Sequence, residues 1–332
     1  MPEFRQNPIT KEWVIIATER ARRPDAFVRP PGPAVAQPAY YPECPFCPGN
    51  EHMSPAETWR HDTGGRWDVR VVPNKFSALS MDGKRTRFNQ GLRHTASGVG
   101  IHEVIIETPQ HNVPIALMPQ EHVEIVMRSY KERYFSASDD PRVELITIFK
   151  NHGSSGGASQ EHPHSQLIAT PIISPQVRSR METALRHFDE AGDCIFCKVL
   201  MDEMYDGKRI INENTHFVSF VPFASLSPFH TWIFPRRHQA SFGEIRDDEL
   251  RSLASILRET LARLYHGLGD PDYNYTIRTA PSENRYCKYY HWYLSLIPRL
   301  TKVAGFELGS GFFVNVTLPE ENAEYLRGVL LP

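Results

Sequence analysis

The stretch that decides the fold runs from a glycine-rich loop into two histidines and a glutamine: residues 153–166 read GSSGGASQEHPHSQ. The apolar run at residues 167–169 follows, so the histidines are expected to begin a strand. Side chains two positions apart on a strand share a face, which would place His162, His164 and Gln166 together beside the loop. Such a loop can bring backbone N–H groups close to an anion, an imidazole can attack phosphorus, and a glutamine amide can donate to a phosphoryl oxygen. The alternative is a glycine turn that leads into a strand with a hydrogen-bonded histidine pair.

The composition is that of an ordinary globular protein, with 40% hydrophobic and 23% charged residues. A length of 332 residues is enough for about two domains. The formal net charge of -2 gives no support for a polyanion-binding surface, so nucleic-acid binding is not expected. No apolar run is long enough to cross a membrane, and residues 1–5 lack the apolar core of a signal peptide. The sequence therefore predicts a cytoplasmic protein without a membrane span.

Four of the five cysteines form two C-x2-C pairs, Cys44 with Cys47 and Cys194 with Cys197. In a cytosolic chain, paired cysteines suggest a metal more than a disulfide. A redox pair is the rival interpretation, but it is expected where a strand meets a helix, whereas Cys44 follows a proline-rich loop. Cys287 is left over and is interpreted as a free thiol.

The chain is a repeat of two halves with the same order of predicted elements. A strand, a helix and a strand are predicted at residues 102–107, 121–135 and 143–150, and again at residues 231–234, 247–266 and 273–278. Leucines at helical spacing support the second helix. The sequence therefore predicts an α+β protein made of two related halves.

Each half also contains four potential metal ligands in the order C-x2-C, His, His. The two sets are Cys44, Cys47, His111 and His162, and Cys194, Cys197, His238 and His291. Two thiolates and two imidazoles suit tetrahedral zinc, so two zinc ions per chain are expected. The alternative for any one of the histidines at residues 111, 238 and 291 is a hydrogen-bonded residue at a strand end.

The halves differ where chemistry is expected. The second half reads YYHWY at residues 289–293, with one histidine and no glycine pair. The first half is therefore interpreted as catalytic and the second as structural or substrate-binding. The basic run at residues 19–24 is either a solvated patch or a guanidinium clamp for phosphate. The segment GFELGSGF at residues 305–312 is either a turn into an edge strand or a loop that lines a sugar site through Phe306.

Together these residues resemble the galactose-1-phosphate uridylyltransferase family, a branch of the histidine-triad superfamily. The resemblance runs almost end to end and rests on NPITKEW (7–13), RARRP (20–24), VPNKF (72–76), FKN (149–151) and, as its most specific part, HPHSQ (162–166). It implies two histidine-triad-like halves with mostly antiparallel sheets and flanking helices. Residues 1–174 would form the catalytic half, and residues 175–332 the half with the second metal site.

The resemblance also implies a ping-pong nucleotidyltransferase. His164 would attack the α-phosphorus of a nucleotide sugar, releasing a sugar 1-phosphate and leaving a nucleotidyl-histidine that a second sugar 1-phosphate attacks. Gln166 would hold a phosphoryl oxygen. The other residues that match family positions are Asn74, Asn151 and Ser159 at the nucleotide and phosphates, Arg20 and Arg23 at the partner subunit's site in a homodimer, and Cys44, Cys47, His111 and His162 at zinc.

The family pattern favours UDP-glucose and galactose 1-phosphate as substrates. Adenylyl transfer is the alternative, because the second metal set and residues 305–311 resemble a plant ADP-glucose phosphorylase branch, and Gly305 and Ser310 replace the family's lysine and tyrosine at the sugar phosphate. Some members end the second half with H-x-H and bind iron there, whereas His291 is followed by Trp292 and Tyr293, so that iron site is expected to be absent. Two further alternatives are a histidine-triad hydrolase, which Gln166 disfavours because an amide is no general acid, and a non-catalytic zinc-stapled nucleotide-binding module.

Overall fold

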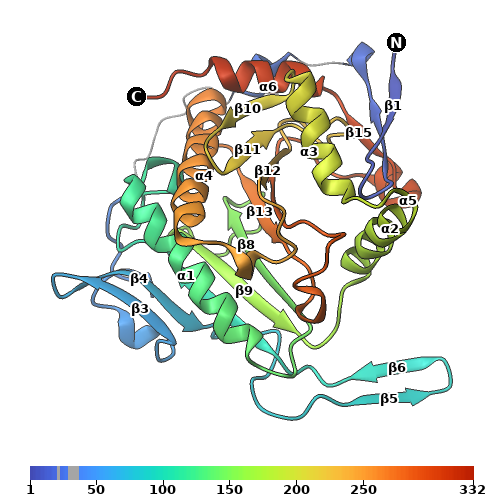
Figure 1. Cartoon of the computed structure of the whole chain (residues 1–332). Helices are drawn as coiled ribbons and strands as arrows, with labels where there is room; N and C mark the ends of the chain where they lie inside the picture. Colours follow the sequence, from blue (N-terminus) through green and yellow to red (C-terminus); the bar gives the residue numbers. More distant parts are fainter. Residues whose placement is uncertain (21–22, 29–36) are drawn as a thin grey trace.

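One ten-stranded sheet runs through the molecule, and each half of the chain contributes five adjacent strands to it (Figure 1). The computed structural model describes residues 1–20, 23–28 and 37–332, except for the side chain of Arg20. The strands of the sheet are β3 (Trp59–Thr63), β4 (Arg66–Pro73), β7 (Ile101–Ile106), β8 (Leu145–His152) and β9 (His164–Thr170) from the first half, and β10 (Ile210–Glu213), β11 (Phe217–Phe220), β12 (Thr231–Pro235), β13 (Tyr273–Arg278) and β14 (Tyr293–Pro298) from the second. All neighbours in the sheet are antiparallel, which confirms the α+β class with mostly antiparallel sheets.

The strand order shows the duplication. Read inwards from its own edge, the first half runs β3-β4-β7-β9-β8 and the second runs β10-β11-β12-β14-β13. The two inner strands, β8 and β13, pair at the centre, where Asn151 lies opposite Asn274 and Ile148 opposite Ile277. The sheet therefore continues from one half into the other.

Two long helices, α1 (Gln120–Ser138) and α4 (Asp247–Leu268), occupy equivalent places in the two halves and cover one face of the sheet (Figure 1). Their apolar residues join strand residues such as Ile105, Leu167 and Ile277 in the main hydrophobic core. The leucine face predicted for the second helix is buried, as Leu253 and Leu257 illustrate. Burial of these faces is the main favourable term for folding.

The remaining elements lie around this sheet and its two long helices. They are α2 (Pro175–Ala191), α3 (Ile195–Asp206), α5 (Gly305–Ser310), α6 (Pro319–Gly328), the 3-10 turns at Thr18–Arg20, Pro24–Phe27, Glu51–Met53, Ile115–Leu117, Phe242–Glu244 and Ser282–Asn284, the sheet of β1 (Glu3–Gln6), β2 (Trp13–Ile16) and β15 (Phe313–Asn315), and the hairpin of β5 (Arg87–Gln90) and β6 (Arg93–Ala96). The hairpin extends away from the body of the molecule (Figure 1). Helix α2 connects the two halves and begins after Ser174, whose hydroxyl accepts a hydrogen bond from the N–H of Val177.

The C-terminal segment differs from its sequence prediction. Residues 305–310 form α5 rather than a turn or an open loop, and the helix ends at Gly311, whose φ of 73° favours glycine. Strand β15 then pairs parallel with β2. No helix of the described residues is long and apolar enough to span a membrane.

Candidate active site

Strand β9 carries the central residues of the site, and it begins at His164. The prediction that His162 also lies on this strand was wrong, because His162 precedes it and groups with Cys44 and Cys47 instead. Leu167 and Ala169 face the core, so the alternation of a strand directs His164 and Gln166 to the opposite face. There they line a cavity of about 650 Å³ together with Asn74 and Ser159. The structure thus brings four of the predicted site residues together around one cavity.

The imidazole of His164 is held in one tautomer. Its Nδ1 lies 2.9 Å from the carbonyl oxygen of His162, and a carbonyl can only accept, so Nδ1 carries the proton and donates it. Burial and, next, the charge of Lys150 lower the pKa of His164. The lone pair is therefore on Nε2, which is the arrangement required of a nucleophile.

A buried ion pair lies directly behind the histidine. Lys150 donates to Glu107 at 2.5 Å and to the carbonyl oxygen of His164 at 3.0 Å. The hydroxyl of Ser165 donates to the other oxygen of Glu107 at 2.8 Å. Both charged residues are almost fully buried. The sequence alone did not reveal this pair, although two charges in apolar strands demand partners.

His102 orients the amide of Gln166. The Nδ1 of His102 accepts a hydrogen bond from the N–H of Ala78 at 3.2 Å, so the proton is on Nε2, which donates to Oε1 of Gln166 at 2.8 Å. The amide nitrogen of Asn74 lies 3.4 Å from this oxygen and 3.0 Å from Nε2 of His102. Because the oxygen is engaged, the NH2 group of Gln166 is left to donate to a ligand. His102 could not be identified as a site residue from the sequence, because only the sheet defines its register opposite Ile168.

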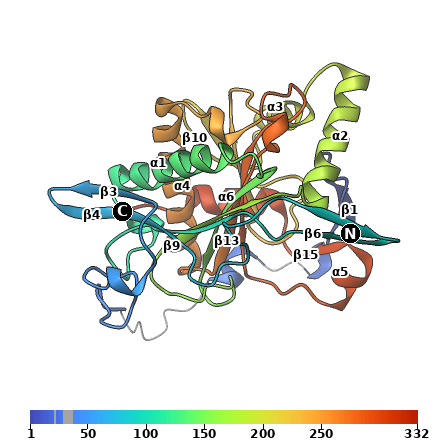
Figure 2. The same ribbon diagram turned by 90° about the horizontal axis from the view of Figure 1, so that it is seen from below.

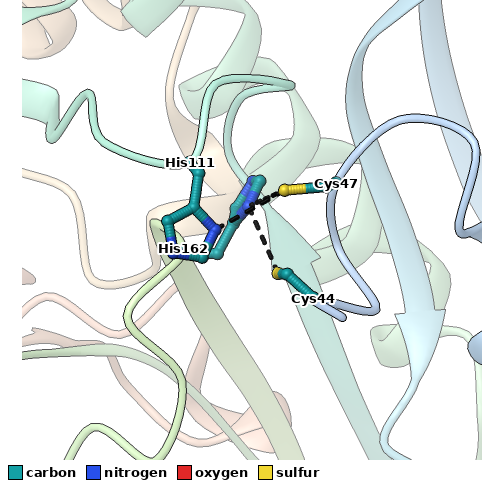
Figure 3. Close-up of side chains that lie close together, drawn as sticks. All are labelled: Cys44, Cys47, His111 and His162. Carbon is teal, nitrogen blue, oxygen red and sulfur yellow. Dashed lines mark hydrogen bonds between the residues drawn. The ribbon is translucent and has the colours of Figure 1, made fainter. Parts of the chain in front are cut away.

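The first predicted metal set converges beside His164 (Figure 3). Cys47 Sγ lies 3.5 Å from Nδ1 of His111 and 3.6 Å from Nδ1 of His162, and Cys44 Sγ lies 3.6 Å from the same atom of His162. Around tetrahedral zinc, bonds of about 2.3 Å to sulfur and 2.0–2.1 Å to nitrogen separate the two ligands by about 3.6 Å. All four side chains are buried, and burial lowers the pKa of His162 to about 4, so its imidazole is neutral, as a metal ligand must be.

The second set converges in the other half. Cys194, Cys197 and His238 form a tight group, with Cys197 Sγ at 3.3 Å from Nδ1 of His238. His291 approaches Cys197 at 3.4 Å through its own Nδ1. Both groups can therefore hold a metal ion. All five cysteines, Cys287 included, are free thiols in the structure.

Asn151, Arg23 and Phe306 do not line the 650 Å³ cavity beside His164. The side-chain oxygen of Asn151 accepts a hydrogen bond from Asn274 at 2.8 Å. Arg23 is exposed and lies outside the cavities beside His164, and the side chain of Arg20 lies outside the described part of the chain. Phe306, on α5, is 52% exposed and also lines neither cavity. In this chain alone, Arg23 and Phe306 do not reach His164.

The glycine loop differs from the expectation that its N–H groups face an anion. The N–H groups of Ser155, Gly156, Gly157 and Ala158 all donate to atoms of the protein. A side chain at Gly156 would meet the carbonyl oxygen of His152 at 2.3 Å, so only glycine fits there. The loop is therefore a self-bonded turn packed on β13, and Ser159 and Gln160, which follow it, line both the 650 Å³ cavity and a neighbouring one of about 760 Å³.

Known proteins resemble this arrangement over the whole chain. Residues 1–174 match the family model of the galactose-1-phosphate uridyl transferase N-terminal domain. The chain belongs to the galactose-1-phosphate uridylyltransferase family. It is a nucleotidyltransferase-type enzyme, which confirms the enzyme class expected from the sequence.

Two relatives and two solved structures illustrate the match. An ADP-glucose phosphorylase from Arabidopsis thaliana is 35% identical over 99% of this chain and 93% of its own length. A galactose-1-phosphate uridylyltransferase from Thermotoga maritima is 28% identical over 98% of both chains. The structure of an Arabidopsis thaliana ADP-glucose phosphorylase with bound ADP-glucose superposes with a TM-score of 0.83, at 34% identity and full coverage of both chains. A uridylyltransferase structure gives a TM-score of 0.75, at 27% identity over 98% of this chain and 97% of that one.

Proposed function

We propose that the protein transfers a nucleotidyl group between a nucleotide sugar and a phosphate acceptor through a covalent intermediate on His164. The observation that carries the proposal is the hydrogen bond from Nδ1 of His164 to the carbonyl of His162, which frees Nε2 at the cavity. Nε2 attacks the α-phosphorus, the P–O bond to the sugar phosphate breaks, and the sugar 1-phosphate leaves with that electron pair. The acceptor phosphate then attacks the same phosphorus and releases His164.

Gln166 and the buried ion pair supply the rest of the chemistry. The Gln166 NH2 group donates to a phosphoryl oxygen as negative charge shifts among the oxygens. A sugar 1-phosphate has a second pKa of about 6, so it leaves without a general acid, which a glutamine could not provide. Lys150 adds positive charge behind His164, and burial together with this charge lowers the pKa of His164, which favours a neutral imidazole before attack.

The proposal includes a zinc ion at each of the two Cys/His groups. The ligand separations beside His164 match tetrahedral zinc, and thiolates with imidazoles are its usual structural ligands. Zinc bound there stabilises the fold. The residues themselves connect that site to the chemistry, because His162 is both a ligand and the acceptor for Nδ1 of His164.

The substrate pair we favour is ADP-glucose and phosphate. The sequence favoured uridylyl transfer, but the Arabidopsis thaliana ADP-glucose phosphorylase is more similar to this chain than the Thermotoga maritima uridylyltransferase, at 35% against 28% identity. The second metal set, which the sequence already linked to the plant branch, supports the same choice. UDP-glucose with galactose 1-phosphate is the second candidate, supported by the family model. The homodimer and the cytoplasmic location remain predictions from the sequence.

A paired assay tests the substrate assignment. Phosphorolysis of ADP-glucose and uridylyl exchange between UDP-glucose and galactose 1-phosphate are measured at matched enzyme and substrate concentrations. We expect kcat/KM for the adenine pair to be higher by at least about tenfold, a difference of about 1.4 kcal/mol in transition-state binding. A faster uridine reaction would overturn the choice of base and leave the role of His164 intact.

Replacing His102 tests how Gln166 is oriented. His102→Phe keeps a ring but removes the donor to Oε1 of Gln166, so the amide can turn its oxygen towards the phosphate. We expect kcat to fall by about tenfold, the worth of one lost hydrogen bond in the transition state, with little change in melting temperature.

The same substitution in a Gln166→Ala background is the control. If His102 acts through Gln166, His102→Phe lowers kcat by less than about twofold in the Gln166→Ala background, because the two effects are coupled. Equal losses in both backgrounds would show that His102 does not work through the amide.

A further inference from the structure

A third cavity lies apart from the catalytic one and is rich in positive charge. It has a volume of about 230 Å³ and shares no lining residue with the two cavities beside His164. Arg180 of α2, Arg278 at the end of β13, and Arg299 and Lys302 of the segment between β14 and α5 line it. In both views α2, α5 and β15 gather on this side of the molecule (Figure 1 and Figure 2). Three segments distant in the sequence thus place four cations around one small space.

Two of these cations, Arg180 and Arg278, each have a buried nitrogen without a partner, although Nη1 of Arg180 donates to the carbonyl oxygen of Gln176 at 3.3 Å. The Nε atoms of Arg180 and Arg278 are buried, as is the hydroxyl of Ser227 on the cavity wall, and none of the three has a hydrogen-bond partner within the described residues. A buried polar group without a partner is rare in a native protein.

The acidic residues of the cavity compensate these charges only in part. Glu12 and Glu307 also line it, but among the residues that the structure describes neither forms an ion pair with any of the four cations. The carboxylate of Glu307 instead accepts a hydrogen bond from the N–H of Ala304. Burial lowers the pKa of Arg278; Tyr293 raises it, and the charge of Arg180 lowers it further. An anion between the two guanidinium groups would offset both their burial and their mutual repulsion.

We propose that this cavity binds a small phosphate-bearing anion between the guanidinium groups of Arg180 and Arg278. The planar fork of arginine matches phosphate oxygens, and two forks can hold one phosphate group. A space of about 230 Å³ is smaller than the roughly 300–1,000 Å³ of sites for drug-sized ligands, so a whole nucleotide is excluded and a single phosphate group or a small phosphate monoester fits. The site does not depend on the function proposed for His164.

Thermal unfolding with added anion tests the site. The full-length protein is prepared without phosphate, and its melting temperature is measured with sodium phosphate, glycerol 3-phosphate or glucose 1-phosphate against sodium chloride at equal ionic strength. Wild type, Arg278→Met and Arg180→Met are compared with Arg186→Met, which removes an exposed arginine of the same helix as Arg180. Any phosphate in the catalytic cavity adds equally to all four proteins.

We expect phosphate to raise the melting temperature of wild type and Arg186→Met, and the two cavity variants to bind phosphate at least about tenfold more weakly. Without anion, Arg278→Met should be as stable as wild type or more stable, because it relieves repulsion between like charges. Comparing the melting-temperature shifts with phosphate, glycerol 3-phosphate and glucose 1-phosphate identifies which of these ligands binds most tightly. Wild-type crystals soaked in tungstate should show an anomalous peak between Arg180 and Arg278. This measurement tests the site even if one of the variants fails to fold. Equal phosphate responses in all four proteins, or no peak at this place, would overturn the proposal.

Discussion

His164→Ala is expected to abolish nucleotidyl exchange, with a loss of about 10⁴-fold or more, because no other group can form the covalent intermediate. The imidazole is buried, but within the described residues its ring makes one hydrogen bond, from Nδ1 to the carbonyl of His162. The substitution should therefore change the melting temperature far less than it changes the rate. Both are measured on the same preparation, the rate by exchange of labelled sugar 1-phosphate into nucleotide sugar.

The matched control is His94→Ala, which removes an exposed histidine from the β5–β6 hairpin. It should exchange at the wild-type rate. Residual exchange in His164→Ala above about one part in a thousand of the wild-type rate would mean that the sugar phosphate is displaced directly by the acceptor, without the histidine.

Loss of the metal sites is the second large effect, and the two sites should respond differently. Cys44→Ser removes a ligand from the group that contains His162, whose carbonyl holds Nδ1 of His164. We expect this variant to lose both stability and activity. The activity of the folded fraction should fall by about 100-fold, because misplacing a reacting group lowers the rate by about that factor. Cys194→Ser lies in the half without the nucleophile, so it should lower the melting temperature while the rate stays within about fivefold of wild type.

Metal analysis and activity of the two variants check this expectation. About two zinc ions per wild-type chain and about one in each variant follow from the two ligand sets. The prediction is wrong if the wild-type protein holds no metal and carries its C-x2-C pairs as disulfides, or if Cys194→Ser loses as much activity as Cys44→Ser.

The parts of the site that are local in sequence could be predicted. His164 and Gln166 share a short strand, so the period of a strand was enough to place them on one face, whereas His162 lies before that strand. The C-x2-C pairs and their histidines repeat in order, which identified both metal groups although their members are far apart in the chain. The duplicated order of strands and helices likewise predicted the α+β fold.

The parts that depend on register between distant strands could not be predicted. Glu107 meets Lys150, and His102 meets Gln166, only because β9 lies between β7 and β8 in a particular register. The prediction that the N–H groups of the glycine loop face an anion was wrong for residues 155–158. Their N–H groups donate to Asp272 of the other half and to carbonyl oxygens of the loop itself. The segment at residues 305–312 offered too short a pattern to distinguish a helix from a turn.

We propose that a nucleotidyl group is carried on Nε2 of His164. Mass spectrometry of the enzyme after incubation with nucleotide sugar alone is the direct test of this intermediate. With ADP-glucose and no acceptor, the account predicts one nucleoside monophosphate adduct per active site, located by peptide mapping on His164 and discharged when phosphate or a sugar 1-phosphate is added. UDP-glucose, used in parallel, should give the weaker labelling. An adduct on another residue, or no adduct under conditions where exchange proceeds, would contradict the account.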